Sequence, residues 1–530
     1  MLALVLVVLL GTALVLGHTT ARRLRVAPPI VLLLGGLLLG FVPALREVRL
    51  PPETVLLLFL PALLFWESLT TSLREIRSNL RPIVLLSTVL VIATAGAVAV
   101  VGYLLGLPWG AAWVLGAAVA PTDATAVSVL ARALPRRTIT TLRAESLVND
   151  GTALVLYGLA VGITVGAEHF TVPHVTALFL LSVAVGALSG VVVAWIGVRV
   201  RGLLADPLLG NVALLIIPFT AFLLAEVVHS SGVLAVVVCG LIMSQAGPRV
   251  ASAEVRRQAI AFWSLATFVL NGSLFVLVGL QAQEAVRELT SAGLARAALA
   301  VAAVSAVVIG VRFLFLFTSP YVIRLLDRRP RQRARRVGAR TRVVSATAGF
   351  RGAVSLAVAL SVPRTLDSGA PFPERDLIVC VTCGVIAVTI VVQGLLLPVV
   401  VRWARLPPDT GVEAERQLAE TLAAEEALAA LPEVAAGLGT AREVLERTRR
   451  EYETHLAVLR AGTGDGDGED EAALRHDRHY TELRLAMIAH KRATVLRLRD
   501  ERRIDDTVLR QLQSRLDIEE VRLTRREAAE

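Results

Sequence analysis

Long apolar stretches, separated by short polar segments rich in arginine, cover the first three quarters of this 530-residue chain. Each stretch runs for roughly 15 to 26 residues, the length that a helix needs to cross about 30 Å of hydrocarbon. Thirteen such stretches lie at about residues 2–17, 27–45, 53–70, 82–106, 109–131, 140–165, 173–198, 207–228, 231–246, 258–281, 293–318, 343–362 and 376–401. The pattern therefore predicts an all-α membrane protein with about 13 transmembrane helices.

The arginines alternate between the two sides of these stretches. Cytoplasmic loops of membrane proteins carry the excess of positive charge. With the N-terminus outside, the inward loops hold 24 arginines and the outward loops hold six. This asymmetry predicts an odd number of spans and a C-terminus on the cytoplasmic side. We expect the protein to lie in the inner (cytoplasmic) membrane of the cell. The net charge of +10 then mainly reflects topology, so we expect the lipid bilayer as a partner and no nucleic acid.

The composition changes abruptly after Leu406-Pro407-Pro408. Hydrophobic residues make up 55% of the whole chain and the mean hydropathy is +0.67, values too high for a soluble core alone. Residues 406–530, in contrast, are rich in charged residues, alanine and leucine. We expect a membrane domain over 1–405 and a cytoplasmic helical tail.

In the tail, two helical stretches at about 411–460 and 470–528 flank a flexible acidic hinge at about 461–471, rich in glycine and aspartate. The tail is thus expected to form a helical hairpin that modulates or dimerises the membrane part.

A short polar run, Glu145 to Gly151, interrupts one of the apolar stretches. A carboxylate at membrane depth is costly unless it is paired, hydrated or used, so it is by default a candidate functional group. On a helix, Glu145 and Asn149 are one turn apart, as are Ser146 and Asp150. We expect these four side chains to form one polar stripe that offers oxygen ligands.

Two other apolar stretches contain residues that break helices. Pro121 falls in the middle of the fifth stretch, where it removes one backbone hydrogen bond. In the twelfth stretch, Gly349 and Gly352 flank Arg351, an arginine at membrane depth. Two interrupted helices in separate halves of a membrane protein are typical of an inverted-repeat transporter with an ion site at the midplane.

Four motifs together resemble those of the monovalent cation:proton antiporters, in the NhaP and NHE branch of sodium/proton antiporters. They are Ala-Pro-Thr-Asp at 120–123, Glu-Ser-Leu-Val-Asn-Asp-Gly at 145–151, Phe-Val-Leu-Val-Gly-Leu-Gln at 275–281 and Arg-Gly-Ala-Val-Ser at 351–355. The resemblance covers roughly residues 1–405 and suggests a bacterial form with a cytoplasmic tail.

That resemblance implies a homodimer in which a core domain moves the ion against a dimerisation domain. It assigns spans at about 82–165 and 293–401 to the core, and spans at about 2–70 and 207–281 to the dimerisation scaffold. The two broken helices are expected to cross mid-membrane.

The resemblance also implies which residues bind the ion. Asp150 corresponds to the essential carboxylate that binds either the cation or protons, and Asp123, Thr122 and Ser146 would complete an oxygen shell for Na⁺. Hard cations prefer several oxygen ligands. No cofactor is expected beyond the transported Na⁺, or another monovalent cation, and H⁺.

Four further residues are expected to support the site. Asn149 stands where electrogenic relatives carry a second aspartate, which implies electroneutral exchange of one cation for one proton. Arg351 must be paired, since an uncompensated guanidinium at this depth is costly. Glu67 and Glu145 are both candidate partners of Arg351. We expect Glu67 to pair with it and Glu145 to position Asn149 or a water. Arg312 is a second candidate partner for either acid.

The sequence thus predicts a secondary transporter, not an enzyme, that exchanges Na⁺ for H⁺ by alternating access and serves pH and sodium homeostasis. Exchange of K⁺ or of several monovalent cations remains an alternative, and a cation channel or ion sensor is an alternative of another class. A membrane enzyme is disfavoured because all eight histidines lie at span ends, in loops or in the tail, away from a catalytic constellation.

Overall fold

The structure, a computed structural model, describes residues 2–24, 26–42, 55–123, 134–166, 172–204, 206–287, 291–326, 338–406, 411–461, 468–501, 503 and 506–527. These residues are almost entirely helical, and the one strand-like contact among them is an isolated bridge between Thr365 and Pro371. Contacts divide the chain into two compact units, Met1–Pro408 and Asp409–Glu530. The predicted all-α fold class is confirmed.

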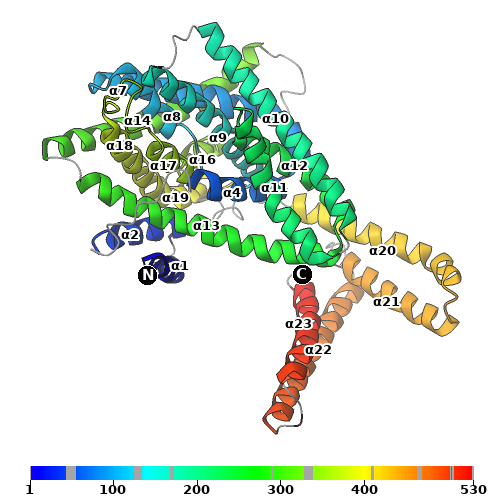
Figure 1. Ribbon diagram of the computed structural model, residues 1–530. Helices are drawn as coiled ribbons and strands as arrows, with labels where there is room; N and C mark the ends of the chain where they lie inside the picture. Colours follow the sequence, from blue (N-terminus) through cyan, green and yellow to red (C-terminus); the bar gives the residue numbers. More distant parts are fainter. Residues whose placement is uncertain are drawn as a thin grey trace. The chain divides into compact units, whose positions relative to one another are not determined.

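The first unit is a bundle of long and short helices that pack against one another (Figure 1). Its first half contains α1 (Leu2–Leu24), α2 (Pro28–Leu39), η2 (Val55–Phe59), α4 (Leu60–Thr70), α5 (Leu73–Ser78), α6 (Leu80–Val84), η3 (Leu85–Val89), α7 (Leu90–Leu104), α8 (Trp109–Val119), α9 (Arg136–Val165) and α10 (Val172–Leu203). Its second half contains α11 (Pro207–Val227), α12 (Gly232–Val250), α13 (Ala253–Arg287), α14 (Ser291–Leu326), α16 (Ala339–Thr347), α17 (Ala353–Leu360), α18 (Arg375–Val388), η5 (Thr389–Gln393) and α19 (Gly394–Ala404). The η segments are π-helical.

The described part of every predicted apolar stretch lies mainly in one of these helices or in a run of consecutive ones. Among the described residues, seven helices are long and apolar enough to cross a membrane, and four apolar helices are shorter. The helical nature of the stretches is therefore confirmed. The number of crossings, thirteen, stays a prediction.

Two buried apolar clusters organise the first unit, and α9 contributes to both. One cluster joins α7, α8, α14 and α18, and receives Ala160 from the second half of α9. The other joins α4, α10, α11 and α12, and receives Leu147 from the first half of α9. The polar residues of α9 therefore lie on a helix that is held between two cores.

Both predicted helix interruptions are present in the described residues. Helix α8 ends at Val119 and the chain is non-helical through Asp123, after which residues 124–133, the remainder of the fifth predicted stretch, lie outside the described residues. The twelfth stretch is split into α16 and α17, with residues 349–352 non-helical between them. The Asp123 N–H donates to the Phe350 carbonyl at 2.9 Å, so the two unwound segments meet.

The second unit is formed by two helical hairpins, α20 (Gly411–Gly437) with α21 (Arg442–Ala461) and α22 (Gly468–Asp500) with α23 (Asp506–Glu527). The stretch predicted at about 411–460 is helical, but it is divided into two helices, α20 and α21. Gly439 has a φ of 63°, and the Thr440 N–H donates to the Ala435 carbonyl at 2.9 Å, which ends the helix.

The stretch predicted at about 470–528 is likewise divided into two helices, α22 and α23. Of the predicted hinge, residues 462–467 lie outside the described residues, whereas 468–471 already belong to α22.

Candidate ion-binding site

A cavity of about 50 Å³ lies where α4, α9, α13, α17 and the first unwound segment meet. This volume accommodates a few water molecules or a partly hydrated ion. Its polar lining consists of seven side chains, from Glu67, Thr122, Asp123, Ser146, Asp150, Asn271 and Ser355. All four residues predicted to bind the ion therefore lie on one cavity.

The charge of this cavity favours cations. Three of the lining side chains are carboxylic acids, and none of the described residues that line the cavity is basic. The carboxylates of Asp123 and Glu67 both repel a negative charge on Asp150. Because Asp150 is 5% exposed, water screens this repulsion poorly. A bound cation or a proton would relieve it.

The polar run on α9 presents two faces, not the single stripe expected from the sequence. Ser146 and Asp150 line the cavity. Glu145 and Asn149 lie beside Arg312 and Arg351 at a tightly packed neighbouring site. Consecutive residues of an α-helix are about 100° apart around its axis, so each pair, spaced four residues apart, keeps its own direction. Ion-facing and supporting side chains are thus separated on one helix.

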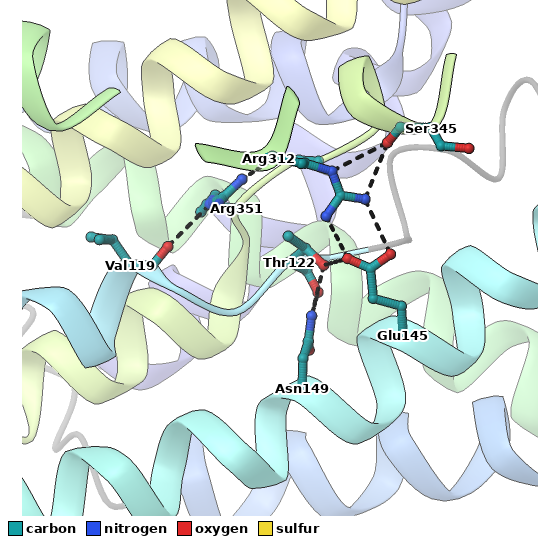
Figure 2. Close-up of polar contacts among 8 residues, drawn as sticks. Val119, Thr122, Glu145, Asn149, Arg312, Ser345 and Arg351 are labelled. Atoms are coloured by element: carbon teal, nitrogen blue, oxygen red, sulfur yellow. Dashed lines mark hydrogen bonds and ion pairs between the residues drawn. The ribbon is translucent and has the colours of Figure 1, made fainter. Parts of the chain in front are cut away.

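Glu145 forms an ion pair with Arg312 of α14, shown in Figure 2. Arg312 Nη1 donates to Glu145 Oε1, and Arg312 Nη2 donates to Glu145 Oε2 at 3.1 Å. The Arg312 Nε and Nη2 atoms also donate to the Ser345 carbonyl, at 3.2 and 3.1 Å. Both charged side chains are only 2% exposed. Such a bidentate arrangement compensates charges that water cannot reach.

Thr122 connects this ion pair to Asn149. The Thr122 hydroxyl donates to Glu145 Oε1 at 3.3 Å and accepts from Asn149 Nδ2 at 2.7 Å (Figure 2). Glu145 thus reaches Asn149 through Thr122. Since Thr122 also lines the cavity, its hydroxyl belongs both to the supporting network and to the candidate oxygen shell.

The expected pairing of Arg351 with Glu67 is wrong. Arg351 Nε donates to the Val119 carbonyl at 3.0 Å, and Arg351 Nη1 donates to the Gly349 carbonyl. The reason is the helix interruption itself, because carbonyls at a helix end lack their usual backbone donors. Arg351 satisfies these carbonyls and ties the end of α8 to the second unwound segment. Glu67 instead lines the cavity.

Two glycines allow the side chains of the site to approach the second unwound segment. A Cβ atom added to Gly349 would overlap the side chain of Arg312. A Cβ atom added to Gly352 would overlap the carboxylate of Asp123. The glycines on either side of Arg351 therefore give room to one residue of the ion pair and to one acid of the cavity.

The sequence interpretation left two lining residues out of the site. Asn271 lies in the middle of α13, and none of the hydrogen bonds found among the described residues involves its side chain. Ser355 is the last residue of the Arg-Gly-Ala-Val-Ser motif and is 1% exposed. Two signals in the sequence could have identified them. Asn271 is a polar residue in the middle of an apolar stretch, and Ser355 closely follows a helix break.

Comparison with known proteins finds the same family along the membrane unit. A family model described as sodium/hydrogen exchanger, transmembrane, matches residues 6–403. An uncharacterised Na⁺/H⁺ exchanger of Mycobacterium tuberculosis is 46% identical over 522 residues, which cover 98% of this chain and 96% of that protein. A sodium, potassium, lithium and rubidium/H⁺ antiporter of Bacillus pumilus is 31% identical, over 68% of this chain and 56% of the antiporter.

A solved structure has the same fold. The sodium proton antiporter MjNhaP1 of Methanocaldococcus jannaschii matches with a TM-score of 0.55 at 19% identity. The match covers 76% of this chain and 99% of that one. At this identity the likeness concerns the arrangement of helices.

Proposed function

The chain belongs to the sodium/hydrogen exchanger family, whose members exchange a cation for protons across a membrane, and from the geometry of its cavity we propose that it exchanges Na⁺ for H⁺ at Asp150. The observation that carries this proposal is the buried cavity in which three carboxylic acids meet without a basic side chain among the described lining residues. Such a cavity attracts either a monovalent cation or a proton, and excludes anions.

Exchange follows from competition for one carboxylate. When Asp150 is ionised, it binds the cation together with oxygen atoms of Asp123, Thr122 and Ser146, the other predicted ligands on the cavity wall. When Asp150 is protonated, the cation has lost its charged ligand and leaves. Alternating access of the cavity to the two sides of the membrane then couples the two movements.

Electroneutral stoichiometry is supported by the position of Asn149. Its amide donates to Thr122 Oγ1 and carries no charge in either state. One carboxylate that releases one proton for each monovalent cation moves no net charge across the membrane. Glu145, the acid on the same face of α9 as Asn149, is held by Arg312 and is not available for this exchange.

The choice of cation has one specific alternative. The Bacillus pumilus relative, as its name says, transports sodium, potassium, lithium and rubidium. Broad exchange of monovalent cations therefore stands beside Na⁺/H⁺ exchange. The name of the more similar mycobacterial relative favours Na⁺.

The cellular setting of this activity is part of the same proposal. The protein would act as a homodimer in the cytoplasmic membrane, with its N-terminus outside and the helical tail inside, in pH and sodium homeostasis. The core domain formed by spans at about 82–165 and 293–401 would move against the dimerisation spans. Positively charged loops on one side of the spans support the orientation.

Reconstitution of the full chain in liposomes tests the proposal. A gradient of Na⁺, K⁺ or Li⁺ is imposed across the liposome membrane in separate experiments, and proton movement is followed with a pH dye inside the liposomes. Each experiment is done with and without an ionophore that clamps the membrane voltage. Proton movement that depends on the cation and is insensitive to the voltage clamp is expected. A channel would conduct the cation without moving protons, and an electrogenic exchanger would respond to the clamp.

A further inference from the structure

Ser355 is a buried polar residue on the wall of the cavity. It is 1% exposed, and it lines the cavity together with Asp150 and Asp123. Its Oγ atom forms no hydrogen bond with any of the described residues. The candidate ion site is therefore bordered by a hydroxyl that the described part of the chain leaves unsatisfied.

Many other buried hydroxyls in these helices are satisfied by their own helix. Ser68 Oγ donates to the Leu64 carbonyl at 2.6 Å, and Thr382 Oγ1 donates to the Ile378 carbonyl at 2.8 Å. In both cases the acceptor lies four residues earlier on the same helix, the usual way for such side chains to be satisfied inside an apolar helix. Ser87, Ser305 and Ser355 lack such a partner among the described residues, and of these three only Ser355 lines the cavity.

The helix break explains why Ser355 lacks this partner. Helix α17 begins at Ala353, so Ser355 is in its first turn. The residue four positions earlier is Arg351, which belongs to the non-helical segment and cannot present its carbonyl along a helix axis. The interruption that forms the cavity thus also leaves this hydroxyl unpaired.

A buried hydroxyl without a partner costs free energy, so an occupant of the cavity that satisfies it gains affinity. We propose that Ser355 Oγ is a further oxygen ligand of the transported cation and contributes to discrimination between cations of different radius. This inference rests on the proposed exchange at Asp150. The ligand shell then includes α17 as well as α9 and the first unwound segment, and Asp123 lies against Gly352 at the start of the same helix.

Cation binding and proton binding should depend differently on this hydroxyl. A cation needs several oxygen atoms around it, whereas a proton binds to one carboxylate oxygen. Loss of Ser355 Oγ should therefore weaken cation affinity and leave the proton dependence of exchange in place. A residue that only supports packing would affect both, together with the stability of the fold.

The test compares Ser355→Ala with Ser305→Ala in the full-length chain. Ser305 of α14 is 4% exposed, and its hydroxyl also lacks a partner among the described residues, but it does not line the cavity. Both substitutions remove an unsatisfied hydroxyl, so both proteins should fold and unfold at or above the wild-type temperature.

In liposomes, Ser355→Ala should raise the Na⁺ concentration for half-maximal exchange by about 3- to 10-fold, with a smaller change in maximal rate. The size of the effect should differ between Li⁺, Na⁺ and K⁺. Ser305→Ala should match the wild type, and Ser355→Thr, which keeps the hydroxyl, should recover most of the affinity. Wild-type half-saturation in Ser355→Ala for all three cations would overturn the inference, as would an equal shift in Ser305→Ala.

Thermal stabilisation of the protein by bound Na⁺ tests the role of Ser355 separately from the proposed exchange. Unfolding temperature in detergent is measured against Na⁺ concentration, without any transport. Absence of exchange in the wild type would contradict the proposed function. A Na⁺-dependent stabilisation that Ser355→Ala shifts to higher concentration would still support Ser355 as a ligand, and an unshifted one would contradict it.

Discussion

Arg312 of α14 and Glu145 of α9 form an ion pair in which both side chains are 2% exposed. The two residues come from distant parts of the chain, and the pair lies directly behind the cavity because Thr122 links Glu145 to the cavity wall. Ionic groups at this depth are stable only together, since either one alone is a buried charge without compensation. The pair therefore makes the position of α9 depend on α14.

Removing one member of the pair should destabilise the protein strongly. Arg312→Gln or Glu145→Gln strands the remaining charge, and a loss of about 3 to 5 kcal/mol in unfolding free energy is expected. Thermal unfolding in detergent measures this. Arg296→Gln is the matched control, because Arg296 pairs with Glu374 at 3.1 Å with side chains 38% and 37% exposed. Its loss should stay below about 1 kcal/mol, and an equal effect of both variants would contradict the argument.

Asp150→Asn should abolish exchange and leave a folded protein. The amide has the shape of the carboxylate but can neither release a proton nor carry the charge that binds a cation. Exchange is measured in liposomes, and folding by elution as a single species and by thermal unfolding. Asp376→Asn, whose side chain is 61% exposed in the first turn of α18, should exchange normally. If Asp150→Asn exchanged ions at the wild-type rate, the site would have to lie elsewhere.

Apparent cation affinity should weaken as pH falls. Protons and cations compete for Asp150, so the cation concentration for half-maximal exchange should rise as the proton concentration rises, by up to about tenfold for each pH unit in the acidic range. The measurement is half-saturation for Na⁺ at several pH values with equal pH on both sides. Half-saturation that does not change with pH would mean that the two ions bind at separate groups.

Gly352→Ala should impair both folding and exchange. The added Cβ overlaps the Asp123 carboxylate, which has to move away from the start of α17. Gly310→Ala in α14 is the control, because a Cβ there meets no atom within 4 Å, and it should leave transport intact and stability unchanged or higher by a few tenths of a kcal/mol. Exchange kinetics and thermal unfolding distinguish the two. Normal exchange in Gly352→Ala would show that the close approach of Asp123 is dispensable.

The helices, and the grouping of polar residues around one cavity, could be predicted from the sequence for identifiable reasons. A membrane span must be apolar over a fixed length, so the described part of each predicted stretch is mainly helical. Acids at membrane depth are rare and costly, which drew attention to Asp150 and Asp123. The family resemblance added Thr122 and Ser146, and the structure brings these four residues together on one cavity. These predictions succeed because the membrane restricts which residue types a spanning helix can carry at each position.

The partners of the buried arginines could not be predicted in the same way. Sequence identifies a buried charge but not the direction of its side chain, and Arg351 found backbone carbonyls where a carboxylate was expected. Backbone groups freed by a helix break do not appear in a sequence as polar residues. The tail shows a similar limit, because a single left-handed glycine, Gly439, ends a helix whose composition favours its continuation.

The hydrogen bond from Asp123 N–H to the Phe350 carbonyl has a consequence for biosynthesis. The first unwound segment enters the membrane long before the second has been synthesised, and in hydrocarbon its exposed backbone groups would have no partners. The cavity can therefore be completed only when α16 and α17 arrive, so its assembly is a late and cooperative step. A truncated chain that ends before α16 should expose this half-formed site to quality control and be degraded, even though it contains Asp150 and Asp123.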